Sequence, residues 1–181
     1  MKLPIYQVDA FTSRLFGGNP AAVVLLPSEL PDETLQAIAA ENNLSETAFV
    51  LPEGQLYRLR WFTPLVEVDL CGHATLATAF VLFETGAVQD DSVRFETRSG
   101  TLVVGRSGDL LSMDFPAWSL EPMECSDGLV AALGARPAEV HGSGYLLTVF
   151  ETEEHVADVA PDFERLGKLD ADGVIVSAPG R

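Results

Sequence analysis

Residues 71–86 read CGHATLATAFVLFETG, and they decide the fold of this 181-residue chain. If residues 74–83 form a helix, their apolar side chains cover every side of it, and Thr75 and Thr78 are the only polar residues among them. A helix that is apolar all round is buried all round. Gly86 is well placed to end it, because glycine readily takes the left-handed conformation that follows a helix. We therefore predict a buried central helix near residues 73–84.

Segments rich in β-branched and aromatic residues flank this helix on both sides and predict strands. The pairs Ser99-Gly100 and Ser107-Gly108 predict hairpin turns. PDETLQAIAAENN, by contrast, predicts an amphipathic helix with Asp32 as N-cap and Asn42-Asn43 at its end. Many strands around one buried helix indicate an α+β fold with a sheet curled around the helix. The expected strands are Ile5–Ala10, Ala22–Leu26, Thr47–Leu51, Tyr57–Thr63, Val93–Thr97, Thr101–Gly105 and Leu110–Phe115.

A weak internal repeat indicates two lobes. Residues 21–51 predict the order strand, helix, strand, and residues 145–177 predict the same order at similar spacing. We expect an N-terminal lobe over residues 1–117 and the first part of a C-terminal lobe over residues 118–181. Only the first copy continues into a buried helix. We therefore expect the second lobe to be incomplete and the chain to be truncated, since strand faces without a central helix would expose apolar surface.

The composition excludes several classes of partner. The formal net charge of −16 argues against nucleic acid and anionic membranes, because phosphate binding needs clustered Lys and Arg. No apolar run approaches the roughly 18 residues that span a bilayer, and the N-terminus does not resemble a signal peptide. Two cysteines, Cys71 and Cys125, do not make a disulfide framework. We expect a cytoplasmic protein.

The triplet Cys71-Gly72-His73 stands at the predicted start of the buried helix. Unpaired N–H groups and the helix dipole make such a start a natural anion site, and they are expected to keep the imidazole neutral. The thiol and the imidazole could be a nucleophile and its base, two metal ligands, or packing groups. The dyad fits poorly, because residues two apart on a helix do not face each other. Cys71, His73, Cys125 and His141 lack the paired spacing of structural zinc, so no metal is expected.

Two further polar residues are candidates for binding or catalysis. Glu46 precedes a predicted strand, and alternation puts it on the face of Leu44, Ala48 and Val50. A carboxylate on an apolar face loses hydration and can serve as a general base. The alternative is a strand-end glutamate turned toward water. Asn19, in FGGNPAA, could offer its amide to a ligand, although Asn-Pro after Gly-Gly is also an ordinary turn signal.

Several segments together resemble the phenazine-biosynthesis isomerase-like (PhzF-like) family. They are VDAFTSRLFGGNPAAVVLL, NLSETAFVL, LRWFTPLVEVDLCGHATLATA, FETRSGTLVV and MDFP, with DGVIVSAPG matching more loosely. The order and spacing of NLSETAF and CGHATLA are specific. The resemblance implies the diaminopimelate-epimerase fold, in which two pseudo-repeated lobes, each a curled mixed sheet around a central helix, hold the site between them.

The resemblance also implies roles for individual residues. Glu46 stands at the family's acid/base glutamate position and His73 at the histidine of its motif. Cys71 and Gly72 stand at the helix start that binds the substrate carboxylate, and Cys71 is also similar in position to a catalytic cysteine of diaminopimelate epimerase. To these we add Asn19 as a substrate-binding candidate.

The activity implied is that of an isomerase or epimerase moving a proton on a small cyclic or amino carboxylic acid without a cofactor. The best-known member isomerises trans-2,3-dihydro-3-hydroxyanthranilate in phenazine biosynthesis. We expect a small-molecule carboxylate as substrate and a homodimer as the assembly. One departure is that the family's second lobe carries an Asp-Pro-Val-Thr-Gly-Ser-Ala type segment, which has no counterpart in this chain. The alternative hypothesis is a non-catalytic lobe that binds a small anion or a protein partner.

Overall fold

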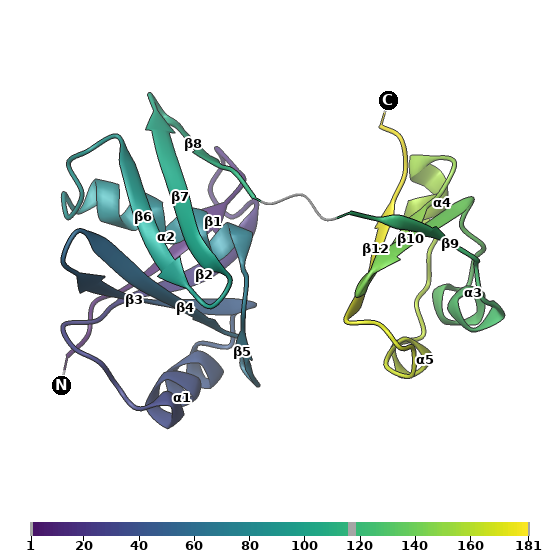
Figure 1. Ribbon diagram of the computed structural model, residues 1–181, viewed down its shortest axis with the longest axis horizontal. Helices are drawn as coiled ribbons and strands as arrows, with labels where there is room; N and C mark the ends of the chain where they lie inside the picture. The colour runs from purple at the N-terminus through teal and green to yellow at the C-terminus, as the bar shows by residue number, and fades with distance from the viewer. Residues whose placement is uncertain (1, 116–118, 181) are drawn as a thin grey trace. The chain divides into compact units, whose positions relative to one another are not determined.

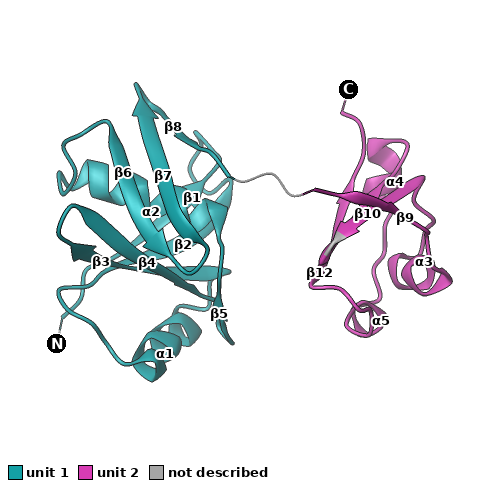
Figure 2. Ribbon diagram, viewed as in Figure 1, with its two compact units in different colours: residues 1–115 teal, residues 116–181 magenta. Residues whose placement is uncertain are grey.

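The computed structural model describes residues 2–115 and 119–180, and of Ser143 the backbone alone. The chain divides into two compact units, residues 1–115 and residues 116–181 (Figure 2). Each unit has its own sheet and its own apolar core.

Unit 1 contains all the strands and both helices predicted for this part of the sequence, with ends displaced by at most a few residues. Sequence reasoning missed the short strand β5. The elements, in chain order, are β1 (Ile5–Ala10), β2 (Asn19–Leu25), α1 (Asp32–Asn42), β3 (Glu46–Glu53), β4 (Leu56–Phe62), β5 (Glu67–Val68), α2 (Gly72–Glu84), β6 (Ser92–Thr97), β7 (Gly100–Ser107) and β8 (Leu110–Met113).

The sheet of unit 1 is mixed and curls around α2. Its strand order is β1-β2-β3-β4-β6-β7-β8, with β5 paired to β4. The pairs β2–β3 and β4–β6 are parallel and the others antiparallel. Strands from both ends of this order, β1 and β8, contact α2 (Figure 1). The predicted wrapping of a sheet around one helix is therefore confirmed.

Helix α2 is buried among the inward side chains of the strands, which include Trp61 and Phe95. The hydroxyls of Thr75 and Thr78 donate to the carbonyls of Cys71 and Ala74 at 2.6 and 2.7 Å, so these polar groups are satisfied within the helix. The N–H of Gly86, at φ 71°, donates to the Phe83 carbonyl as a residue that ends a helix should.

The prediction that α2 is buried on all sides is wrong at Phe80, which is 45% exposed. The edge strands β1 and β8 do not pair with each other, so one side of α2 remains uncovered.

The N-cap predicted for α1 is also wrong. The cap residue is Pro31, and Asp32 is the first helical residue. Asp32 does not cap the helix because its Oδ1 accepts from Nη1 of Arg60 at 2.8 Å. The predicted end is confirmed, with Asn43 in the left-handed conformation.

Unit 2 has a four-stranded sheet whose order is β12-β11-β10-β9. Its core lies between the sheet and the helices and centres on Leu129, Leu133, Val140 and Phe150. In the described residues of both units, no helix is long and apolar enough to cross a membrane. The elements are β9 (Glu121–Met123), α3 (Asp127–Leu133), β10 (Glu139–Ser143), β11 (Tyr145–Val149), α4 (Glu153–Ala157), α5 (Phe163–Leu166) and β12 (Gly173–Ser177).

The internal repeat is visible in the strand pairing of the two units. In unit 1, β1 and β2 are antiparallel and β2 and β3 parallel, with α1 between the parallel pair. In unit 2, β10 and β11 are antiparallel and β11 and β12 parallel, with α4 and α5 between. The face of the unit 2 sheet that points away from its core carries Tyr145, 38% exposed, and Ile175, 49% exposed.

Candidate active site

Glu46 opens strand β3, and the pairing of the strands fixes which way it points. It lies in register with Ala21 of β2 and on the same face as Ala48 and Val50, which pack in the core around α2. The predicted face is thus confirmed. The carboxylate sits at the end of an apolar surface, with 20% of the side chain exposed.

Cys71 is the cap residue of α2, and this changes its relation to His73. Its backbone is extended, with φ −148° and ψ 110°, so it stands before the helix rather than in it. Its Sγ lies 3.4 Å from Nδ1 of His73. Residues two apart point away from each other only when both are helical. The prediction that Cys71 and His73 do not face each other is therefore wrong.

The other side of the same imidazole faces the glutamate. Nε2 of His73 lies 3.2 Å from Oε2 of Glu46. The two atoms are close but not aligned for a hydrogen bond, and both are buried with no other hydrogen-bond partner in the described part of the chain. One imidazole therefore lies between a sulfur and a carboxylate. We call Glu46, Cys71 and His73 the triad.

The triad favours a charged imidazole. The contact with Cys71 and then the contact with Glu46 raise the pKa of His73 from 6.5 to about 10, against the opposing effect of burial. The expectation that the helix start keeps this imidazole neutral is therefore wrong. Its close sulfur and carboxylate neighbours outweigh the partial positive charge of the helix end.

The start of α2 offers backbone donors that the described residues leave without a partner. The first N–H group that donates within the helix is that of Thr75, to the Cys71 carbonyl, and the Cys71 side chain makes no capping hydrogen bond. The N–H groups of residues 72–74 therefore have no partner inside the helix. The side chains of Met113 and Phe115 pack near Gly72, where a Cβ on this glycine would lie 3.8 and 3.5 Å from them. The side chains of Met113 and Phe115 therefore lie against the start of the helix at Gly72.

Asn19 lies outside the triad but on the same face of the sheet as Glu46. It opens β2 and, two residues before Ala21, shares the face on which Glu46 lies. Sequence reasoning did not single out Trp61, which is 1% exposed and opposite Ala48 in the strand register. Its indole N–H is buried without a hydrogen-bond partner in the described residues. The only signal in the sequence was its place on the inward face of a strand.

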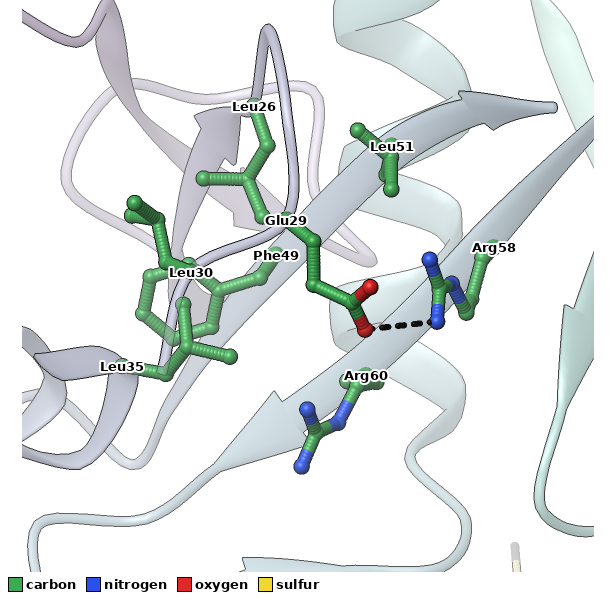
Figure 3. Close-up of a pocket in the computed structure, with 8 residues that line it drawn as sticks. All are labelled: Leu26, Glu29, Leu30, Leu35, Phe49, Leu51, Arg58 and Arg60. Carbon is green, nitrogen blue, oxygen red and sulfur yellow. Dashed lines mark hydrogen bonds and ion pairs between the residues drawn. The ribbon is translucent and has the colours of Figure 1, made fainter. Parts of the chain in front are cut away.

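A separate hollow lies on the other face of the sheet, beneath the segment that leads into α1 (Figure 3). Both of its arginines are already paired. Arg58 contacts Glu29 and Glu53, at 2.9 and 2.8 Å. Arg60 binds both carboxylate oxygens of Glu67 as well as Asp32. This hollow is less suited to an anionic ligand than the helix start. Its apolar lining consists of Leu26, Leu30, Leu35, Phe49 and Leu51.

Among the described residues, the triad is also the group of side chains whose arrangement could hold a metal. One ligand atom from each member lies within 4.8 Å of the other two. However, Sγ and Oε2 contact opposite nitrogens of one imidazole, so an ion bound at either nitrogen requires one of the two groups to move. The arrangement is better suited to moving protons than to coordination.

Comparison with known proteins places these residues in a family. Residues 8–180 match the family described as phenazine biosynthesis-like protein, PhzC-PhzF. Two Pseudomonas aeruginosa proteins named uncharacterized isomerases are 57% identical over 178 residues and 51% identical over 181. The matches cover 98% and 99% of this chain and 69% of each relative. A crystal structure of a PhzF family protein from Enterococcus faecalis matches with a TM-score of 0.89 and 48% identity, over 97% of this chain and 68% of that one. The expected α+β fold is thereby confirmed, whereas the roles of Glu46, His73, Cys71, Gly72 and Asn19 stay predictions.

Proposed function

Since the chain belongs to the phenazine biosynthesis-like (PhzC-PhzF) family, we propose that it is an isomerase that moves a proton on a small carboxylic acid without a cofactor. The observation that carries the proposal is the Glu46 carboxylate. Its Oε2 is buried, has no hydrogen-bond partner among the described residues and faces the imidazole of His73 at 3.2 Å. A buried carboxylate oxygen that accepts no hydrogen bond from the described residues is suited to take a proton from carbon.

In this mechanism the substrate carboxylate binds the free N–H groups of residues 72–74, where the dipole of α2 favours negative charge. Binding there holds the reacting carbon beside Glu46, which removes its proton. The same carboxyl then returns the proton to another carbon of the conjugated acid. Negative charge that develops on the substrate is stabilised by the helix amides and by the charged imidazole of His73.

His73 positions the base in this scheme. A positively charged ring at 3.2 Å attracts the Glu46 carboxylate and holds it toward the helix start. The role of Cys71 is then to hold the other edge of the ring, at 3.4 Å. Asn19 and Trp61 offer donors to the remainder of the substrate.

The test is exchange of carbon-bound hydrogen with solvent. The chain is incubated in D₂O with a panel of cyclic unsaturated carboxylic acids, and deuterium incorporation and isomer formation are followed by NMR. Glu46→Gln keeps the shape and hydrogen-bonding capacity of the side chain but removes the base. It should raise the barrier by about 2–5 kcal/mol, a loss of roughly thirty-fold to several thousand-fold in rate. Asp9→Asn, on β1, which β2 separates from the strand of Glu46, serves as a matched control.

An acid exchanged equally fast by the parent and by Glu46→Gln would refute the role of Glu46. Acids that bind but never exchange would instead support the non-catalytic anion-binding alternative.

A further inference from the structure

The triad has the order of a nucleophile, a base and an orienting group. Sγ of Cys71 contacts Nδ1 of His73 at 3.4 Å, and Nε2 of the same ring faces Oε2 of Glu46 at 3.2 Å. Covalent catalysis by thiols uses this order, since the imidazole takes the thiol proton and a third group orients the ring and stabilises its charged form. Proton transfer by Glu46 alone does not require a sulfur at the far edge of the ring.

The surroundings of Cys71 supply what acyl transfer needs. Cys71 directly precedes the N–H groups of residues 72–74, which have no partner inside the helix. These groups can donate hydrogen bonds to the negatively charged oxygen of a tetrahedral intermediate. Cys71 is 7% exposed and the side chain of His73 is 9% exposed, so little water competes for these groups. Nε2 of His73 and Oε2 of Glu46 are both buried and face each other, yet neither has a hydrogen bond within the described residues, which is typical of a site and not of a packed core.

We propose that Cys71 is a covalent nucleophile that accepts acyl groups from activated esters or thioesters, with His73 as its base and Glu46 as the residue that orients the ring. This activity does not depend on the isomerase reaction. In the neutral form of the ring, whose share grows as the pH approaches 10, Nδ1 of His73 takes the thiol proton as the sulfur attacks the carbonyl carbon and an S–C bond forms. The leaving alkoxide or thiolate departs with the proton from His73. Water, activated by the same imidazole, then cleaves the S-acyl bond, which releases the carboxylic acid and restores the thiol.

The chain contains its own controls. Cys125 is a second free thiol, half-buried, in unit 2. His141 is a second histidine paired with a glutamate, at 2.9 Å from Glu139. Neither belongs to the triad, so both test whether an ordinary thiol or an ordinary His–Glu pair behaves in the same way.

The experiment uses p-nitrophenyl acetate as the probe. Release of p-nitrophenolate is followed optically, and acetylation of each cysteine is quantified by peptide mass spectrometry of the same sample. We expect Cys71 to be acetylated at least about tenfold faster than Cys125, and a stoichiometric burst to persist in Cys125→Ala. His73→Asn should remove the rate advantage of Cys71, whereas His141→Asn should leave it unchanged.

Two readouts guard against misfolded variants. In denaturant the two thiols should react at the same rate, which shows that the advantage belongs to the folded chain. The comparison of Cys71 with Cys125 is made within the unmodified protein and needs no variant. Equal rates for the two thiols in the folded protein, or a Cys71 rate that His73→Asn leaves intact in a folded variant, would overturn the proposal.

Discussion

The charged state of His73 makes the stability of the fold depend on pH in a predictable direction. The neighbouring sulfur and carboxylate raise its pKa from 6.5 to about 10. A group whose pKa is higher in the folded state stabilises that state fully below its unfolded pKa, and the contribution is lost as pH rises through the folded pKa. For His73 the contribution is complete below about pH 6.5 and disappears by about pH 10.

The size of this contribution follows from the same shift. Each tenfold change in proton affinity is worth about 1.4 kcal/mol, so a rise from 6.5 to about 10 corresponds to about 5 kcal/mol at most. This figure is an upper limit, because the partner carboxylate of Glu46 is 20% exposed and water and salt screen the pair there. His73→Gln removes the charge, and the stability difference between the parent and this variant should be largest near pH 6.

The assay is urea denaturation of the parent and of His73→Gln from pH 6 to pH 10. The parent should lose its advantage of several kcal/mol across this range. NMR titration of histidine-labelled protein, with His141 and His155 assigned by substitution, gives the pKa of His73 directly. A stability difference that stays constant with pH, together with a His73 signal that titrates near 6.5, would refute the reasoning.

Three other predictions concern separate parts of the chain. Sulfate or a small dicarboxylate soaked into crystals should bind the N–H groups of residues 72–74, and an anion found elsewhere, with this helix start blocked by a side chain, would count against the proposed substrate site. Gly18→Ala should destabilise unit 1 by about 2 kcal/mol or more in urea denaturation, because φ is 82° and the new Cβ would collide with the Ala10 carbonyl. Gly54→Ala, at φ 65° with no atom near its Cβ, should cost only about 1 kcal/mol, and equal losses would show that the collision does not matter. The 181-residue chain should self-associate through the open sheet face of unit 2, and light scattering should show less association for Ile175→Lys. A monodisperse monomer of the parent chain, resistant to protease up to its end, would contradict this.

The sequence predicted the features of the fold that depend on periodicity. The apolar run of α2 indicated a central helix, and the alternation along β3 placed Glu46 on the inward face. Both follow from local patterns that repeat over several residues. The exposure of Phe80 could not be predicted in this way, because it depends on where the sheet ends and not on the helix itself.

The contacts of the site were less predictable. The pairing of Cys71 with His73 depends on the extended backbone of one cap residue, which composition does not reveal. Met113, the last residue of β8, and Phe115, two residues beyond it, approach Gly72 from some forty residues further along the chain. Such contacts arise from the way the whole sheet curls around α2, so no local sequence pattern predicts them.

The position of His73 between a sulfur and a carboxylate means that one ring is held at both of its edges. Replacing Cys71 or Glu46 therefore does more than remove one functional group, because the imidazole also loses a neighbour and is free to turn. A rate lost in either variant combines the effect of the missing side chain with that of the displaced ring. Only a variant whose crystal structure keeps His73 in place assigns the lost rate to the substituted residue.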